Sequence, residues 1–409
     1  MTRLVSTPHL AIRLAIHLAL ALALALILSA AVPALAQEAA APIPIGMAVA
    51  QTGPVALFGQ EQMEGAHIAL TRQNAAQNPH ETSIALVLRD TGGDEAGAVS
   101  AFRTLIETDK VVAIVGPTLS QQAFAADPLA DQAKTPVVAP SNTAAGIPGI
   151  GPFVCRISAP MSQVAPHSVR RALGLNPGIS RVAVLFARND TYSVSETATF
   201  REAVKSLGLT TVAVEEFQTT DTDFSTPVAA VLGAKADLVI ISGLAADSGA
   251  LVRQLRQKGY AGTIVGGNGL NSTNVFPVCG AQCDGVLVAQ AYSPDAVAQN
   301  PVNQGFVNDF QAAYHKTPGQ FSAQAYTAVQ VVAEAVARVE KDSGRKAGEF
   351  EPAALREAVN AALRSGPFLT PLGEIRILPS GEIEQKDVFV SKIAMNSDGR
   401  TGSFVLVAE

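Results

Sequence analysis

Three small hydroxyl residues follow two short apolar runs that are close together in the sequence. Ser120 comes after the run VVAIVG (111–116), and Ser141 and Thr143 come directly after PVVAP (136–140). Apolar runs rich in β-branched residues are typical of strands buried on both faces of a parallel sheet. With a helix N-cap expected at Ser120, two strand ends and a helix N-terminus would together suit a small carboxylate. The alternative is that these residues only cap helices and form turns, as serine and threonine commonly do.

Five further residues lie in loops at predicted strand ends and complete a candidate pocket: Phe58, Asp190, Tyr192, Leu244 and Asn268. Together they would supply an aromatic or apolar wall and oxygen acceptors for an amine, which is the composition of a small-molecule site. Each loop taken singly is also explained by turn formation. The sequence has no G-x-S-x-G, H-E-x-x-H or P-loop motif, and its scattered histidines suggest no triad. We therefore expect a binding protein without a cofactor or catalytic residue.

The N-terminus has the features of a secretory signal peptide over residues 1–36. Arg3 and Arg13 precede an apolar run (14–32), and an A-x-A cleavage site ends at Ala36. The alternative of an uncleaved membrane anchor is disfavoured by Pro33 and the small residues at the cut site. Cleavage would remove two arginines and no acidic residue, so the formal charge would change from −6 to −8. An acidic, periplasmic protein with no affinity for nucleic acid or membranes is expected.

The sequence contains three cysteines. Cys279 and Cys283 are four residues apart in a predicted loop, and Cys155 stands alone. In an oxidising compartment a Cys279–Cys283 disulfide is the leading interpretation. A metal-binding pair is the alternative, although no histidine lies nearby to complete such a site. Cys155 is expected to be a buried free thiol.

The order of predicted elements indicates an α/β protein with two units. From residue 43 to about 150, apolar strands alternate with amphipathic helices, and a second alternation of similar length follows. Such alternation is typical of right-handed βαβ units and a parallel sheet. From Ser293 the pattern changes to three helical segments and then to turn-linked β segments. The chain therefore predicts two parallel sheets flanked by helices.

Several stretches are similar to the periplasmic substrate-binding proteins of branched-chain amino acid ABC transporters, the Leu/Ile/Val-binding type. The stretches are QTGPVALFGQEQMEGA, DTGGDEAGAVSAFRTLI, VVAIVGPTLSQQ with PVVAPSNTA, DTDFSTPVAAVLGAKADLVIISG, LVRQLRQKG and FSAQAYTAVQVVAEAV. Their order and spacing cover almost the whole mature chain.

The resemblance implies a two-lobed type I periplasmic binding fold, in which each lobe is a parallel sheet flanked by helices. The chain would pass between the lobes three times, near Cys155–Ser158, Ala289–Ser293 and Gly366–Thr370. Lobe one would then comprise residues 43–157 with 292–367. Lobe two would comprise residues 158–291 with 368–409.

The resemblance also implies roles for the candidate residues. Ser120, Ser141 and Thr143 match the positions that hold the carboxylate and amine of the ligand. Phe58 matches an aromatic wall of lobe one, and Tyr192 matches an aromatic position of lobe two.

Two positions depart from the leucine-binding pattern. Asn268 stands where that pattern has an acidic residue for the amino group, and Leu244 stands where it has a tyrosine. An amide oxygen accepts from an ammonium more weakly than a carboxylate does. Either Asp190 supplies the missing charge, or the ligand is an acylated amino acid, a short amide or an aromatic acid.

We therefore expect the solute-binding component of an ABC importer, a monomer that passes its ligand to permease subunits in the inner membrane. The first ligand class is an aliphatic or branched-chain amino acid. One alternative is the same fold binding an amide, urea or aromatic acid. A ligand sensor and an exported hydrolase are further alternatives, and the hydrolase is disfavoured because no nucleophile–base pair is evident.

Overall fold

The computed structural model describes residues 41–75, 82–295 and 299–407. The predicted signal peptide, residues 1–36, lies outside the described residues. Residues from Pro42 onward form one compact unit, and its strands are distributed over three sheets.

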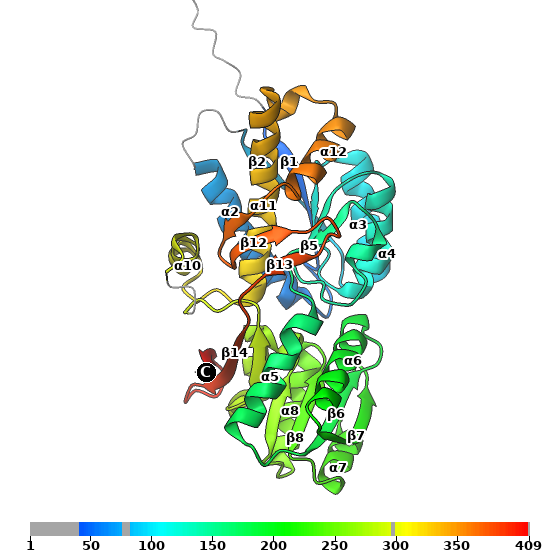
Figure 1. Ribbon diagram of the computed structural model, residues 1–409, viewed down its shortest axis with the longest axis vertical. Coiled ribbons are helices and arrows are strands. Elements are labelled where there is room, and N and C mark those ends of the chain that lie inside the picture. The colour runs from blue at the N-terminus through cyan, green and yellow to red at the C-terminus, as the bar shows by residue number, and fades with distance from the viewer. Residues whose placement is uncertain (1–40, 76–81, 296–298, 408–409) are drawn as a thin grey trace, which may run out of the picture. The chain divides into compact units, whose positions relative to one another are not determined.

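The first sheet has five parallel strands in the order β2-β1-β3-β4-β5. The strands are β1 (Ile43–Val49), β2 (Ile84–Asp90), β3 (Ile114–Val115), β4 (Val137–Ala139) and β5 (Val154–Arg156). The helices that pack on it are α2 (Ala56–Ala75), α3 (Glu95–Arg103), α4 (Ser120–Gln132), α11 (Gln320–Ser343) and α12 (Pro352–Leu363). Helices α2 and α11 pack against each other on one face, and α3 and α4 lie on the other (Figure 1). Coverage of both faces explains why β1 is buried along almost its whole length.

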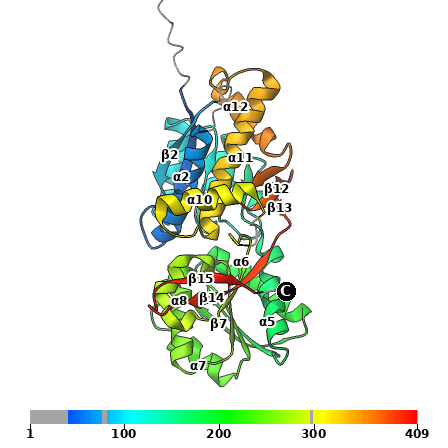
Figure 2. The ribbon, with the colours of Figure 1, turned by 90° about the vertical axis from the view of Figure 1, so that its left-hand side faces the viewer.

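The second sheet has seven strands in the order β15-β14-β10-β9-β8-β6-β7. The parallel strands are β6 (Arg181–Ala187), β7 (Thr210–Phe217), β8 (Leu238–Ser242), β9 (Thr263–Gly266) and β10 (Leu287–Gln290). Two antiparallel strands extend the sheet beyond β10, namely β14 (Phe389–Met395) and β15 (Gly402–Leu406). Figure 2 shows these two strands, in red, with the helices and strands of the second sheet.

Alternate residues of β6 pack into two different layers. Val182 and Val184 belong to the core under α5 (Met161–Leu175) and α6 (Thr191–Ser206). Ala183 and Leu185 belong to the core under α7 (Ser225–Gly233) and α8 (Ala245–Gln257). This alternation is the period-two arrangement of a strand covered on both faces. The α/β fold with helix-flanked parallel sheets that the sequence predicts is confirmed.

Three short strands form a separate antiparallel sheet: β11 (Phe368–Thr370), β12 (Gly373–Ile377) and β13 (Ile383–Gln385). This sheet contacts the first sheet, because the backbone N–H of Arg156 in β5 donates to Gly381 O at 3.1 Å. Arg156 also forms an ion pair with Glu382 at 2.7 Å. The sequence predicts that residues 368–409 belong to lobe two. The contacts of Arg156 instead join the first part of this range, residues 368–385, to the first sheet. We propose that the third passage lies between Gln385 and β14.

The remaining helical segments connect these layers. They are α9 (Phe276–Cys279), α10 (Pro301–Tyr314), a π-helical turn at Thr104–Thr108, and 3₁₀ turns at Pro148–Ile150, Asn268–Asn271, Thr273–Val275, Gly280–Cys283 and Ala347–Glu349. Cys279 and Cys283 form a disulfide. The free Cys155 is buried in β5, and burial raises the pKa of its thiol to about 11.

Candidate binding site

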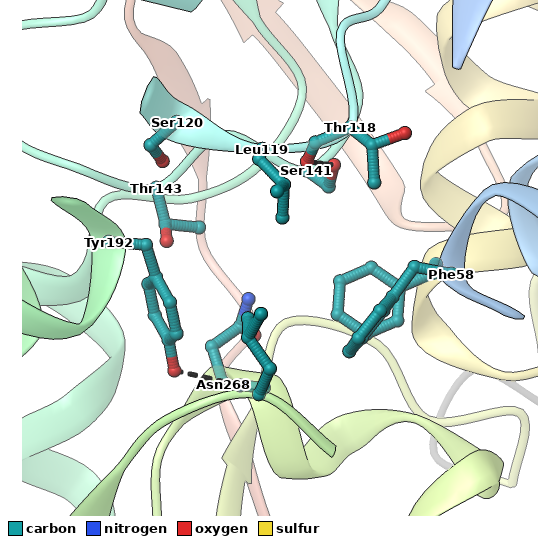
Figure 3. A pocket seen from close by; sticks show the side chains of 11 residues that line it. Phe58, Thr118, Leu119, Ser120, Ser141, Thr143, Tyr192 and Asn268 are labelled. Atoms are coloured by element: carbon teal, nitrogen blue, oxygen red, sulfur yellow. Dashed lines mark hydrogen bonds between the residues drawn. The ribbon is translucent and has the colours of Figure 1, made fainter. Parts of the chain in front are cut away.

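Loops at the carboxyl ends of the two parallel sheets line a cavity whose empty space, including the part open to solvent, is about 360 Å³. Figure 3 shows its lining side chains. Residues from the first-sheet side are Phe58, Thr118, Leu119, Ser120, Ser141, Thr143 and Phe321, and those from the second-sheet side are Tyr192, Leu244, Asn268 and Gly269. Seven of the eight predicted site residues therefore lie around one cavity. Asp190 is the exception, and Thr118, Leu119, Gly269 and Phe321 were not predicted.

The hydroxyl groups of the first-sheet loops differ in what they can offer a ligand. Ser141 Oγ accepts from Gln62 Nε2 and donates to Thr118 O, both at 2.7 Å, so its hydrogen is committed. Ser120 Oγ accepts from the backbone N–H of Ala144 at 3.3 Å, and its own hydrogen has no acceptor within the described chain. Thr143 Oγ1 is buried and has no hydrogen-bond partner among the described residues. Ser120 and Thr143 are thus the hydroxyls that can donate into the cavity.

The prediction that Ser120 caps helix α4 is wrong. The N-cap is Leu119, whose extended backbone precedes the helix, and the backbone N–H of Leu119 donates to Gln122 Oε1 at 3.0 Å. Ser120 is the first helical residue. Because the Gln122 side chain performs this local role, the Ser120 hydroxyl remains directed to the loop that carries Thr143.

A glycine allows the polypeptide to approach the first sheet closely just before this site. Gly116 follows β3 with φ of 139°. A Cβ atom there would lie 2.1 Å from Ala48 O in the neighbouring strand β1. Only glycine fits this position without displacement of the backbone, and the site residues Thr118, Leu119 and Ser120 follow directly.

A buried arginine holds the loop that carries Thr143. Arg156 Nη1 donates to Asn142 O at 3.1 Å and to Ala144 O at 2.8 Å. Its Nε and Nη2 donate to the two carboxylate oxygens of Glu382 at 2.9 and 2.7 Å. The bidentate pair fixes the plane of the guanidinium. Arg156 therefore connects the small three-stranded sheet to the backbone on either side of Thr143.

Aromatic side chains form two sides of the cavity. The rings of Phe58 and Phe321 are 5.1 Å apart and nearly perpendicular, at 88°, which is a favourable edge-to-face geometry. Phe321 comes from the start of α11, far along the chain from the other first-sheet residues. Tyr192, near the start of α6, lies across the cavity from Phe58 (Figure 3).

A buried glutamate outside the cavity orients the second-sheet side. The hydroxyl of Tyr192 donates to Glu196 Oε2 at 2.7 Å and accepts from the backbone N–H of Gly269 at 2.7 Å. The backbone N–H of Asn268 donates to Glu196 Oε1 at 2.8 Å. Burial raises the pKa of Glu196 to about 7, although these hydrogen bonds oppose the rise. Glu196 therefore holds both the tyrosine ring and the loop that carries Asn268.

The side chain of Asn268 is itself held by two amides. Asn268 Oδ1 accepts from Gln320 Nε2 at 2.8 Å and from Asn271 Nδ2 at 3.2 Å. Its nitrogen is directed into the cavity in Figure 3.

Asp190 does not line the cavity, so the suggestion that it supplies a charge to the ligand is not supported by its position. It is the N-cap of α6, and its Oδ2 accepts from the backbone N–H of Ser193 at 2.9 Å and from Ser193 Oγ at 2.5 Å. Burial raises its pKa. Among the described residues, none of those that line the cavity carries a charged side chain.

No group of three or more potential metal ligands is present in residues 41–75, 82–295 and 299–407. No helix within them is long and apolar enough to cross a bilayer.

Two parallel sheets with a cavity between their carboxyl ends are typical of the class of two-lobed solute-binding proteins. The chain belongs to the periplasmic binding protein family, whose model matches residues 42–400. It is 26% identical over 352 residues to the leucine-, isoleucine-, valine-, threonine- and alanine-binding protein of Pseudomonas aeruginosa, covering 86% of this chain and 90% of that protein.

Solved structures have the same fold. A leucine-binding protein from Thermotoga maritima is 27% identical with a TM-score of 0.76, covering 90% of this chain and 98% of that one. A solute-binding protein of an ABC transporter from Rhodopseudomonas palustris, solved with 3,4-dihydroxybenzoic acid, is 22% identical with a TM-score of 0.76. The match covers 90% of this chain and 96% of that one. The predicted type I periplasmic binding fold is therefore confirmed.

Proposed function

We propose that this protein is the periplasmic solute-binding component of an ABC importer and that it holds a small carboxylate with an apolar body in the cavity. The observation that carries the proposal is the pair of hydroxyl donors, Ser120 and Thr143, beside the N-terminus of α4 and opposite aromatic walls. Hydroxyl and backbone donors at a helix N-terminus favour a negative charge. A neutral, mostly apolar remainder favours an apolar ligand body.

The aromatic side chains of the cavity limit the size of the ligand. Phe58, Phe321 and Tyr192 restrict the space around the apolar body. The ligand class that fits is a monocarboxylate with a short aliphatic chain or a single aromatic ring.

Family membership supports the transport role. Relatives of the chain are named as amino acid-binding proteins, which makes a branched-chain amino acid the first candidate ligand. The ligand would bridge the two sheets and favour the arrangement in which both contact it. The loaded protein, acting as a monomer, would deliver it to membrane permease subunits, and no covalent bond would be made or broken.

A thermal-shift and calorimetric screen of the mature chain (37–409) tests the proposal. The panel contains aliphatic and aromatic acids, free amino acids and short amides. A ligand that binds only the folded state stabilises it by RT ln(1 + [L]/Kd), about 3 kcal/mol at a hundredfold excess over Kd. Because the chain has no tryptophan, a dye or calorimetry is preferable to intrinsic fluorescence.

Two variants connect the binding to the cavity. Ser120→Ala and Thr143→Ala each remove one donor to the carboxylate, and roughly ten- to hundredfold weaker binding is expected for each. Ser100→Ala, at an exposed position of α3, is the matched control and is expected to bind as the parent does. Full affinity in both cavity variants would show that the carboxylate is held elsewhere.

A further inference from the structure

The side chain of Asn268 is a polar group that the second-sheet side contributes to the cavity. Which end of its amide faces the cavity therefore affects which ligands the site can hold. Amide oxygen and nitrogen are distinguished by their hydrogen-bond partners. Two separate chains of hydrogen bonds fix this choice here.

The first chain starts from a backbone donor. The N–H of Ala291 can only donate, and it donates to Gln320 Oε1 at 2.7 Å. Gln320 must then present its Nε2 to Asn268, where it donates to Oδ1 at 2.8 Å. Gln320 is almost fully buried, so water is not available as an alternative partner.

The second chain starts from a backbone acceptor. Ala289 O can only accept, and it accepts from Asn271 Nδ2 at 2.8 Å. The same Nδ2 reaches Asn268 Oδ1 at 3.2 Å. Both chains therefore assign the oxygen of Asn268 to internal donors and its NH₂ group to the cavity, as Figure 3 shows.

The other polar groups of the cavity also present donors or are already engaged. Ser120 and Thr143 have hydroxyl hydrogens to donate. The Tyr192 hydroxyl donates to Glu196 and accepts from Gly269. In the described chain, no carboxylate lines the cavity. A buried ammonium group in such a site would face the NH₂ group of Asn268 and would find hydroxyl oxygens but no charged acceptor, which is unfavourable.

We propose that the cavity selects carboxylates that lack an ammonium group, and that Gln320 is the positioning residue that sets this selectivity through Asn268. The inference rests on the proposed carboxylate site and replaces the amino acid, the first candidate ligand there, with simple aliphatic or aromatic acids. The NH₂ group of Asn268 donates to the ligand from the second-sheet side, while Ser120 and Thr143 donate from the first-sheet side. A ligand contacted from both sides in this way connects the two sheets without any formal positive charge.

Matched ligand pairs test the inference in the mature chain. The first pair is L-leucine and 4-methylpentanoate, and the second is L-phenylalanine and 3-phenylpropanoate; the members of each pair differ only in the ammonium group. Dissociation constants are measured by calorimetry. The parent protein is expected to bind at least one of the two acids, and to bind that acid at least tenfold more tightly than the corresponding amino acid.

Two variants are expected to shift this ratio toward the amino acid. Asn268→Asp keeps one oxygen for Gln320 and Asn271 and directs a second oxygen into the cavity. Gln320→Glu replaces the nearer of the two donors to Asn268 Oδ1, at 2.8 Å against 3.2 Å for Asn271, with an acceptor. The amide of Asn268 is then expected to turn and present Oδ1 to the ligand. Either change should alter the ratio of the two dissociation constants by ten- to hundredfold. A purely structural role for Gln320 would weaken both members of a pair equally.

The control is Asn176→Asp, the same substitution at an exposed position where the side-chain oxygen accepts from Gly178 N. It is expected to leave the ratio unchanged. Equal or tighter binding of the amino acids by the parent protein would overturn the inference and leave the proposed carboxylate site intact. An unchanged ratio in both variants would also overturn it. Failure of every acid and amino acid to bind would instead refute the proposed function. If Asn268→Asp does not fold, the inference is still tested by the two ligand pairs in the parent protein and by the ratio of dissociation constants in Gln320→Glu.

Discussion

Glu61 in α2 connects to the second-sheet side of the protein through a buried carboxyl group that is well suited to a test by pH. Its Oε1 accepts from Ser272 Oγ at 2.6 Å, from Thr273 Oγ1 at 3.2 Å and from Asn274 Nδ2 at 2.8 Å. Its Oε2 is buried without a partner in the described chain. Burial raises the pKa of Glu61 from 4.5 to about 7, and the hydrogen bonds and Lys316 only partly oppose this rise.

The raised pKa predicts how stability depends on pH. The folded state binds the Glu61 proton more tightly than the unfolded state, so its contribution to stability is fully present below pH 4.5. That contribution is lost as the pH rises through about 7. A shift of this size corresponds to about 3 kcal/mol of unfolding free energy. About 2 kcal/mol of it falls between pH 5 and pH 8.

Glu61→Gln is the perturbation, because glutamine has the shape of the protonated carboxyl group. Its oxygen can keep the three donors, and its NH₂ group replaces the oxygen that has no partner. Urea unfolding of the mature parent and variant is followed by far-UV circular dichroism at pH 5 and pH 8. The unfolding free energy of the variant minus that of the parent is expected to grow by about 2 kcal/mol between these values. Other buried carboxyl groups are common to both proteins and cancel in this difference.

The matched control is Glu357→Gln, at an exposed position where the carboxylate pairs with Lys134. It is expected to change stability equally at both pH values. A difference for Glu61→Gln that is the same at pH 5 and pH 8 would refute the argument that this carboxyl group is protonated by burial.

Three further predictions follow from the packing around the site. Arg156→Met removes the partner of Glu382, whose side chain is 32% exposed, and takes a donor from the carbonyl groups of Asn142 and Ala144. The expected cost is about 2 to 3 kcal/mol of unfolding free energy, measured by urea titration; an unchanged midpoint would contradict this. Phe321→Ala removes a ring that is 4% exposed and is expected to cost about 3 to 5 kcal/mol, while calorimetry should show a shift in preference toward bulkier acids. The double variant Cys279→Ser with Cys283→Ser opens a short loop and is expected to cost about 2 kcal/mol of unfolding free energy. Because the disulfide stabilises only its own loop, ligand affinity measured by calorimetry is expected to be unaltered.

Much of the site could be predicted because its residues follow strands directly. Ser120, Ser141 and Thr143 come after apolar runs, and the carboxyl ends of parallel strands meet at one edge of a sheet. Local neighbours such as Thr118 and Gly269 could have been found by the same rule. The residues that were missed or misplaced depend on longer-range contacts.

Phe321 is an example of such a contact. It begins a helix far along the chain, and only packing of α11 against α2 brings its ring onto Phe58. Asp190 is the opposite case, since its position next to Tyr192 suggested a ligand contact and its side chain instead caps α6. The orientation of the Asn268 amide depends on Gln320 and on the backbone of Ala291, which no local pattern in the sequence connects.

Helix α11 has a consequence for how the polypeptide acquires its structure during synthesis. The five-stranded sheet is complete in sequence at Arg156, whereas α11, which covers one of its faces together with α2, begins at Gln320. Nearly all of α11 is buried, so a nascent chain that ends before it would expose the apolar face of that sheet. Contacts between such distant segments must close late and slow folding. A fragment that ends near residue 157 is therefore expected to aggregate, and any split or permuted version of the protein must keep residues 320–343 with residues 43–157.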